Sequence, residues 1–231
     1  MTAKTAVFFD LDGTLLPMDL DVFIQTYFGL LARQLPQYDI NAMLGALWQG
    51  TKAMMTNDGS MTNMDRFWSV FSRILGPEIR QEEPVLERFY RTDFHKAKAV
   101  CGENLLAKEV VALAHRRADL VVLATNPLFP RCAVESRLSW IGLKPEDFDY
   151  ITTYENSTSC KPTAAYYLDI CRMLDLSPAN CRMIGNDLQE DGLGAAAAGI
   201  PVHIVTDCLI THDLDLDAYS HSTFADLLQI L

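Results

Sequence analysis

The stretch VFFDLDGTLL, residues 7–16, runs an apolar segment directly into two aspartates and a glycine. Residues 5–9, TAVFF, form a continuous apolar run rich in strand-favouring residues, which is typical of a strand buried on both faces of a parallel sheet. Carboxylates beside such a strand are costly to bury unless something pairs with them. Asp10 and Asp12 therefore indicate a site that must contain positive charge.

The apolar periodicity beyond this stretch divides the chain into two parts. From about residue 19 to residue 96 the pattern is helical, without a strand-like run, and we expect helices over 21–35, 40–55, 64–75 and 84–100. From residue 97 onward, short apolar runs alternate with helical patterns. There we expect strands over 119–125, 149–154, 181–187 and 202–205, and helices over 104–118, 131–143, 163–174, 188–199 and 222–231.

This alternation predicts an α/β fold with a doubly wound, Rossmann-like parallel sheet. The helical part is too long to be a simple connection between strands, so we interpret it as an inserted, all-helical cap. The predicted organisation is an α/β catalytic core made of residues 1–16 and 97–231, with the helical cap over residues 17–96. The acidic segment 212–221 lacks the glycine and glutamate of a calcium loop and is predicted to be solvated.

The composition limits the partners of the chain. Its 231 residues include 30 acidic and 19 basic ones, for a formal net charge of -11, which disfavours nucleic acid as a partner. No stretch approaches the ~18 apolar residues of a membrane span, and the N-terminus does not resemble a signal peptide. The six cysteines are irregularly spaced, as expected of free thiols. We expect a cytoplasmic protein without a membrane partner; its oligomeric state is not predicted.

Polar side chains follow three of the predicted strands. Because the carboxyl ends of parallel strands meet at one edge of a sheet, we expect these side chains to lie together. Several carboxylates at one site repel one another, and Mg²⁺ resolves this by binding one or two of them together with water and substrate phosphate. Gly13 permits a turn after Asp12. The residues expected at this edge are Asp10, Asp12, Thr125, Asn126, Lys161, Asn186, Asp187 and Asp191.

A metal held by carboxylates, beside a lysine, a threonine hydroxyl and free backbone N–H groups, is typical of a phosphate site. The chemistry that this set favours is nucleophilic: one aspartate attacks phosphorus and forms an aspartyl-phosphate. The other aspartate donates a proton to the leaving oxygen and then activates water. Mg²⁺ and Lys161 offset the charge of the transferring group.

Four motifs occur in an order that resembles a known family. They are DLDGT (10–14), a hydroxyl residue after an apolar strand (Thr125), KP (161–162) and GNDLQED (185–191). Together they resemble the motifs of the haloacid dehalogenase superfamily, in its phosphatase-type branch. The resemblance covers roughly residues 1–16 and 97–231. The insertion after the first motif is similar to the helical cap of phosphoglycolate-phosphatase-like members.

The resemblance implies catalytic and phosphate-binding roles. Asp10 is then the nucleophile, and Asp12 is the general acid and base. Thr125 and the backbone N–H of Asn126 bind the phosphoryl oxygens, and Lys161 is the cation that stabilises them. Pro127 follows this threonine closely, so the next helix is expected to start late.

The resemblance also implies a magnesium site. Asp10 and Asp187 supply carboxylate ligands, and Asp12 supplies its backbone carbonyl. Asp191 supports the metal directly or through water, and Gly13 supports the turn. The implied function is magnesium-dependent hydrolysis of a small-molecule phosphate ester.

Alternative functions stay open at this point. A phosphotransferase of the same chemistry, such as a sugar phosphomutase, carries the same motifs, because the two differ only in whether water or a hydroxyl accepts the phosphoryl group. A binding protein on an inactivated scaffold is a remoter alternative, since no catalytic position is substituted. Carbon–halogen cleavage is disfavoured because the dehalogenase branch lacks an aspartate at the position of Asp12. A dinucleotide enzyme is excluded because DLDGT replaces the glycine-rich turn.

Overall fold

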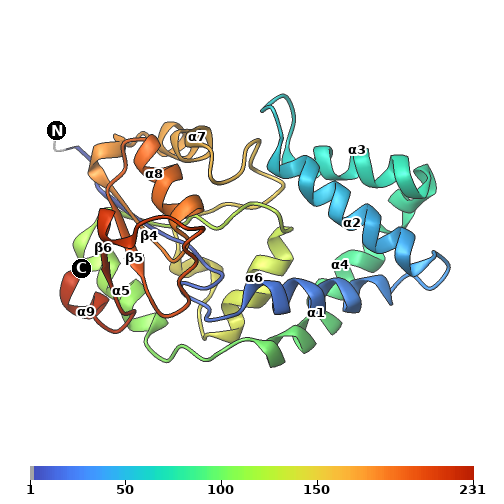
Figure 1. Cartoon of the computed structure of the whole chain (residues 1–231), viewed down its shortest axis with the longest axis horizontal. Coiled ribbons are helices and arrows are strands. Elements are labelled where there is room, and N and C mark those ends of the chain that lie inside the picture. The colour runs from blue at the N-terminus through green and yellow to red at the C-terminus, as the bar shows by residue number, and fades with distance from the viewer. Residues whose placement is uncertain (1–2) are drawn as a thin grey trace.

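The computed structural model describes residues 3–231 and contains a six-stranded sheet (Figure 1). The strand order is β3-β2-β1-β4-β5-β6, and every neighbouring pair is parallel. This confirms the predicted doubly wound parallel sheet. The strands are β1 (Ala6–Phe9), β2 (Leu120–Leu123), β3 (Tyr150–Ile151), β4 (Cys181–Gly185), β5 (Val202–Val205) and β6 (Ser220–Ser222).

The first strand is apolar because both of its faces are covered. Phe8 belongs to a core cluster that includes Tyr166 and Tyr167, whereas Phe9 belongs to the cluster on the opposite face. Both phenylalanines are fully buried. The first cluster lies against α7 (Ala164–Leu174) and α8 (Gly194–Ala197), and the second against α5 (Ala107–Arg117), α6 (Arg131–Trp140) and α9 (Leu227–Ile230). Because both faces of β1 are buried, its sequence is a continuous apolar run and does not alternate between apolar and polar residues.

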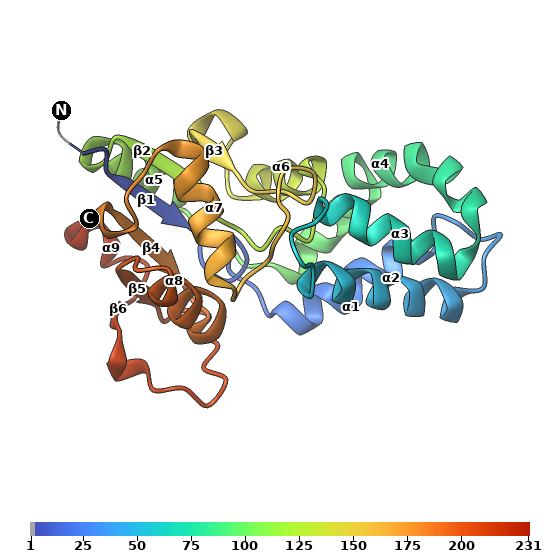
Figure 2. The same cartoon turned by 90° about the horizontal axis from the view of Figure 1, so that it is seen from above.

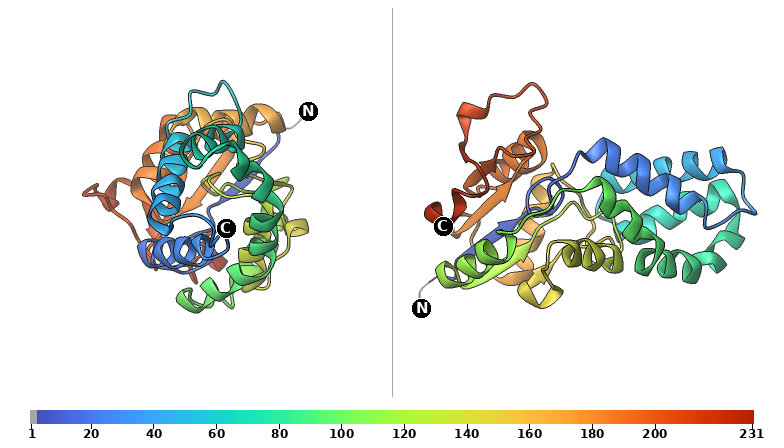
Figure 3. Two further views of the ribbon diagram at one scale, coloured as in Figure 1. Left: turned by 90° about the vertical axis from the view of Figure 1, so that its right-hand side faces the viewer. Right: turned by 90° about the horizontal axis from the view of Figure 1, so that it is seen from below.

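Four helices form a group beyond the carboxyl end of β1, away from the sheet (Figures 2 and 3). Asp19, Asp39 and Thr62 cap the first three, because each side chain accepts a hydrogen bond from a free N–H of the first turn. Their buried apolar residues join the same cluster as one face of the sheet. The helices are α1 (Leu20–Ala32), α2 (Ile40–Met55), α3 (Asn63–Leu75) and α4 (Glu83–Arg91).

Several predicted boundaries were wrong for local reasons. The helix expected over 84–100 ends at Arg91 and is followed by a 3-10 helix over Asp93–Val100, because Thr92 adopts a non-helical conformation. The helix expected from Asn104 begins at Ala107, although the Asn104 side chain does accept a bond from a nearby backbone N–H. The helix over 188–199 is a π-helix, Leu188–Leu193, followed by α8.

The last part of the chain differs most from the prediction. The helix expected over 222–231 is reduced to α9, and β6 occupies residues that were assigned to the acidic loop and that helix. This strand pairs with β5, and the buried His203 on β5 lies within hydrogen-bonding distance of Ser220 and Ser222. A strand of small polar residues has no apolar periodicity, so the sequence pattern did not indicate it.

Candidate active site

The predicted polar residues meet at the carboxyl ends of the strands. A cavity of about 90 Å³ lies there, and Lys161, which does not line it, bonds to two residues that do. Every one of the eight residues expected at this edge of the sheet is thus brought into one cluster. The predicted residues that line the cavity are Asp10, Asp12, Thr125, Asn126, Asn186, Asp187 and Asp191.

Lys161 is the cation that pairs with Asp10. Its Nζ lies 2.7 Å from Asp10 Oδ1 and 2.7 Å from Asp191 Oδ1, and its side chain is fully buried. Burial alone would lower the pKa of Lys161, but the charges of Asp10 and Asp191 together hold it well above the usual value. Lys161 is therefore charged, and it is the cation that pairs with the buried carboxylate of Asp10.

The pKa of Asp10 is governed mainly by its burial. Burial raises its pKa to about 7; the positive charge of Lys161 opposes this shift, while the negative charges of Asp191 and Asp12 add to it. A bound divalent cation would favour the carboxylate form. The site therefore has a surplus of negative charge that one lysine does not remove.

The turn after β1 depends on Gly13. Its φ of 90° lies in the region that favours glycine, and a Cβ there would lie 2.3 Å from Asn186 Nδ2. The Thr14 hydroxyl lies 2.9 Å from Asn186 Oδ1 and 3.2 Å from Asp10 Oδ2. The predicted turn is thus present, and it packs against the end of β4.

Asp187 begins the π-helix that follows β4. Its Oδ1 accepts bonds of 2.8 Å from the backbone N–H groups of Gln189 and Glu190, and its Oδ2 lies 2.9 Å from His212 Nε2. His212 was not among the predicted site residues. It lies in the segment 212–221 that was interpreted only as a loop, and no sequence pattern links it to Asp187.

Hydrogen bonds hold the two residues that follow β2, Thr125 through its backbone carbonyl and Asn126 through its side chain. The carbonyl of Thr125 accepts bonds from the hydroxyls of Thr152, at 2.7 Å, and Tyr166, at 2.8 Å. The side-chain amide of Asn126 donates to Glu190 Oε1 at 2.8 Å, while its own Oδ1 is buried without a partner. Helix α6 starts only at Arg131, after Pro130, so the predicted late start is correct.

Glu190 gives the site a pH-dependent contribution to stability. Burial raises its pKa from 4.5 to about 8, so between these values the folded protein binds more protons than the unfolded chain. The stabilisation that the folded protein gains from protonated Glu190 is complete below about pH 4.5 and is lost as the pH rises through 8. We expect urea unfolding with EDTA to show a shallower loss of stability from pH 5 to pH 8 in Glu190→Gln than in the original chain. Equal slopes in the two proteins would contradict this.

Arg137 is the partner of Asp12, and this pairing was not predicted from the sequence. Arg137 lies on α6, is fully buried, forms an ion pair with Asp12 Oδ2 and places its guanidinium 4.0 Å from the centre of the Phe129 ring. A signal existed, because Arg137 occupies the apolar face of its helix beside Ala133 and Leu138. A charge in that position requires a buried partner.

The donor set fits a hard divalent cation. Asp10, Asp12 and Asp187 line one cavity and present only oxygen atoms, and Asp12 Oδ1 has no hydrogen-bond partner within residues 3–231. Within residues 3–231 no group of three or more His, Cys, Asp or Glu side chains is placed so that it could hold a metal ion by itself. A Mg²⁺ ion at this cavity would take one or two of the carboxylates and would need water and phosphate for its other positions.

Neither a membrane-spanning helix nor a disulfide is found within residues 3–231. No helix within residues 3–231 is both long and apolar enough to cross a membrane. All six cysteines are unpaired, as the sequence analysis expected.

Solved structures of known proteins share the fold over the whole chain. A predicted phosphoglycolate phosphatase from Haemophilus somnus 129pt is 20% identical, with a TM-score of 0.59 and coverage of 100% of this chain and 99% of the other. CbbY from Rhodobacter sphaeroides, in complex with phosphate, is 17% identical, with a TM-score of 0.59 and coverage of 97% and 96%. YfnB from Bacillus subtilis, assigned as a HAD hydrolase and bound to magnesium, is 18% identical, with a TM-score of 0.58 and coverage of 100% and 99%.

At these identities the likeness shows the fold alone. No curated protein sequence matches the chain. The family model for haloacid dehalogenase-like hydrolases, however, matches residues 4–199, which include all four motifs. The chain therefore belongs to the haloacid dehalogenase-like hydrolase family.

Proposed function

We propose that the protein is a magnesium-dependent phosphatase that hydrolyses small phosphate monoesters through an aspartyl-phosphate on Asp10. The observation that carries this proposal is the pairing at one cavity of two aspartates with separate cations, Lys161 for Asp10 and Arg137 for Asp12.

In the first step, an Asp10 carboxylate oxygen attacks phosphorus and the bond to the ester oxygen breaks. Asp12 gives its proton to the departing oxygen, which leaves as an alcohol. Lys161, and the Thr125 hydroxyl together with the Asn126 N–H, offset the negative charge on the phosphoryl oxygens. The product of this step is an acyl phosphate on Asp10.

In the second step, water attacks phosphorus, and Asp12 takes the proton that the water loses. The bond between phosphorus and the Asp10 oxygen breaks, so both aspartates return to their starting states and inorganic phosphate leaves. Mg²⁺, held by Asp10, the Asp12 carbonyl and Asp187, would polarise the phosphoryl group and reduce the repulsion between phosphate and carboxylates. Asp191 holds Lys161 and accepts bonds from the N–H groups of Asn186 and Asp187.

Small substrates and a helical cap are part of the same proposal. The cavity of about 90 Å³ has room for a phosphoryl group but not for a large ester. Residues 17–96 would act as the cap over a core of residues 1–16 and 97–231. Supporting this, Asn63 is fully buried at the start of α3 and donates bonds to the carbonyls of Pro127, at 3.2 Å, and Ser159, at 3.3 Å. Six unpaired cysteines support a reducing, cytoplasmic location.

The proposal is tested with a panel of sugar, nucleotide and organic-acid phosphates, assayed with Mg²⁺ and with EDTA. We expect release of inorganic phosphate from at least one ester with Mg²⁺, loss of this activity with EDTA, and recovery when Mg²⁺ is added in excess. Product analysis with a hexose 1-phosphate separates hydrolysis from isomerisation. Formation of an isomeric sugar phosphate would instead identify a mutase, and inactivity on the whole panel would contradict the proposal.

Arg137 provides a second, independent check of the role of Asp12. Replacing Arg137 with Met removes the buried cation that positions this carboxylate, and a small misplacement of a reacting group costs about 10²-fold in rate. We expect kcat to fall by about this factor while KM stays close to its original value. Lys at this position should recover part of the loss. Arg131→Met, on the exposed side of the same helix, is the matched control, and an unchanged kcat in Arg137→Met would contradict the assignment.

A further inference from the structure

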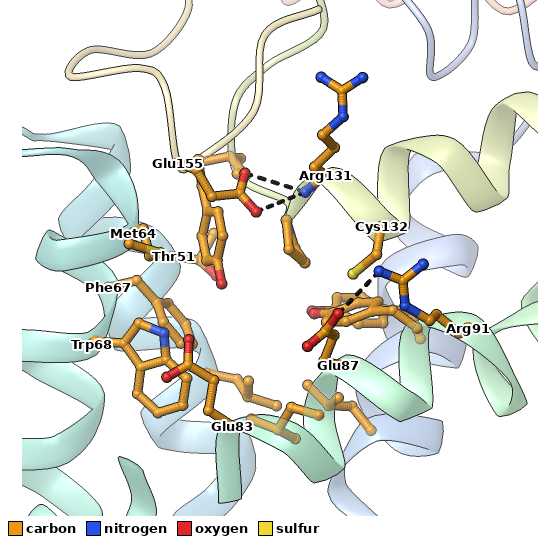
Figure 4. Close-up of a pocket in the computed structure, with 18 of the residues that line it drawn as sticks. Thr51, Met64, Phe67, Trp68, Glu83, Glu87, Arg91, Arg131, Cys132 and Glu155 are labelled. Atoms are coloured by element: carbon orange, nitrogen blue, oxygen red, sulfur yellow. Dashed lines mark hydrogen bonds and ion pairs between the residues drawn. The ribbon is translucent and has the colours of Figure 1, made fainter. Parts of the chain in front are cut away.

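A second cavity, of about 370 Å³, lies among α1–α4 and the start of α6 (Figure 4). We call it the helical cavity. Leu128 lines both this cavity and the smaller one at the carboxyl ends of the strands, so the two are neighbours. None of the residues given a role in the proposed reaction lines the helical cavity. Its volume is in the range of ordinary small-molecule sites.

Aromatic side chains form much of its wall. Faces of such rings attract cations as well as apolar groups, so an aromatic wall suits an organic cation better than an anion. Tyr27 and Tyr90 lie with their hydroxyl oxygens 2.7 Å apart, and this pair uses only one of its two protons. The second proton is available to a ligand. The aromatic residues of the wall are Tyr27, Phe67, Trp68, Tyr90 and Tyr154.

Trp68 is a buried part of this wall. The residue is 2% exposed, and its indole N–H lies beside the hydroxyl of Tyr154, another residue of the wall. Figure 4 shows the indole nitrogen on the side of the ring that faces the cavity.

The charges around the helical cavity are predominantly negative. Four glutamates and two arginines line it, and two of the glutamates are neutralised locally: Glu87 by Arg91 at 3.0 Å, and Glu135 by Arg131 at 2.8 Å. In Figure 4 the guanidinium of Arg131 extends away from the cavity. The charge that remains on the wall is therefore that of the other two glutamates.

The other two glutamates, Glu83 and Glu155, differ in which group lies near their negative charge. Glu83 lies 3.5 Å from Arg80, a cation outside the lining of the cavity. Glu155 accepts bonds of 2.9 Å and 3.2 Å from the backbone N–H of Arg131, and among the described residues it forms no ion pair with Lys or Arg. The Glu155 carboxylate thus lies at the cavity with a negative charge that no side chain balances.

We propose that the helical cavity binds a small organic amine in its cationic form, with an aromatic or aliphatic body. The ammonium group lies at Glu155, and the body packs against the ring faces of the wall. This site is separate from the phosphate site and does not depend on the proposed reaction.

The test uses the full chain and three probes of similar size but different charge: 2-phenylethylammonium, 2-phenylethanol and phenylacetate. By calorimetry we expect the ammonium ion to bind about tenfold more tightly than the alcohol, and phenylacetate not to bind measurably. Glu155→Gln should weaken binding of the ammonium ion roughly fivefold, as for a partly exposed ion pair, and leave the alcohol unchanged. Glu146→Gln, an exposed glutamate outside the cavity, is the matched control.

Tryptophan fluorescence locates the bound probe. We expect the ammonium ion to change the emission of the original chain, and the change to be lost in Trp68→Phe, which removes the fluorophore at the cavity wall. Equal affinities for the ammonium ion and the alcohol, or an unchanged affinity in Glu155→Gln, would overturn the proposal. So would a fluorescence change that persists in Trp68→Phe.

Discussion

Asp10→Asn is expected to abolish turnover of p-nitrophenyl phosphate, with a loss of at least roughly a thousandfold, because an amide cannot form the acyl phosphate. The fold should survive, since Lys161 keeps its ion pair of 2.7 Å with Asp191. The measurement is release of p-nitrophenol with excess Mg²⁺, together with a urea unfolding curve on the same sample.

Asp175→Asn is the matched control for this change. Its side chain is 98% exposed, so the substitution alters the same chemical group far from any buried partner. The control should retain full activity. A folded Asp10→Asn protein that keeps more than a tenth of the original activity would contradict the assignment of the nucleophile.

Lys161→Met is expected to cost about 3–5 kcal/mol of unfolding free energy, because two buried carboxylates lose their shared cation. Nζ lies 2.7 Å from an oxygen of each, and Asp191 is 1% exposed. We also expect activity to disappear, since no other side-chain cation bonds to Asp10 in residues 3–231. Urea unfolding at pH 7 measures the first effect.

A double variant separates charge from packing. Adding Asp191→Asn to Lys161→Met removes one of the uncompensated charges, so it should recover part of the stability that the single change loses. Activity should not recover, because Asp10 still lacks its cation. If the double variant were less stable than Lys161→Met alone, charge compensation would not be the reason for the burial of Lys161.

The sequence predicted well which polar residues lie together at the edge of the sheet, because the fold follows from strong local signals. Apolar strands such as 202–205 and a regular helix such as 40–55 were predicted with their observed bounds. Once the strands are parallel, their carboxyl ends meet by geometry, so the residues after β1, β2 and β4 had to cluster. These residues could therefore be predicted to lie together without knowing any contact between their side chains.

The partners of the site residues were harder to predict. Arg137 pairs with Asp12 across 125 residues of sequence, and His212 with Asp187 across 25. Such pairs depend on how loops and helices pack, which apolar periodicity does not encode. Edge strand β6 was missed for a related reason: its polar residues are stabilised by β5 rather than by burial of their own side chains.

The buried side chain of Asn63 fixes where the helical group meets the α/β part. Four hydrogen bonds from this one residue reach loops of the α/β part, because its side-chain amide donates to Pro127, Ser159 and Cys160 and its backbone N–H donates to Ser157 at 2.8 Å. Each such bond is worth only about 0.5–1.5 kcal/mol, because water replaces it when the groups separate. The helical group and the α/β part also share one buried apolar cluster, so separating them would expose apolar surface as well as break these bonds. The hydrogen bonds of Asn63 therefore fix the position at which the two parts meet, while the apolar cluster supplies most of the attachment.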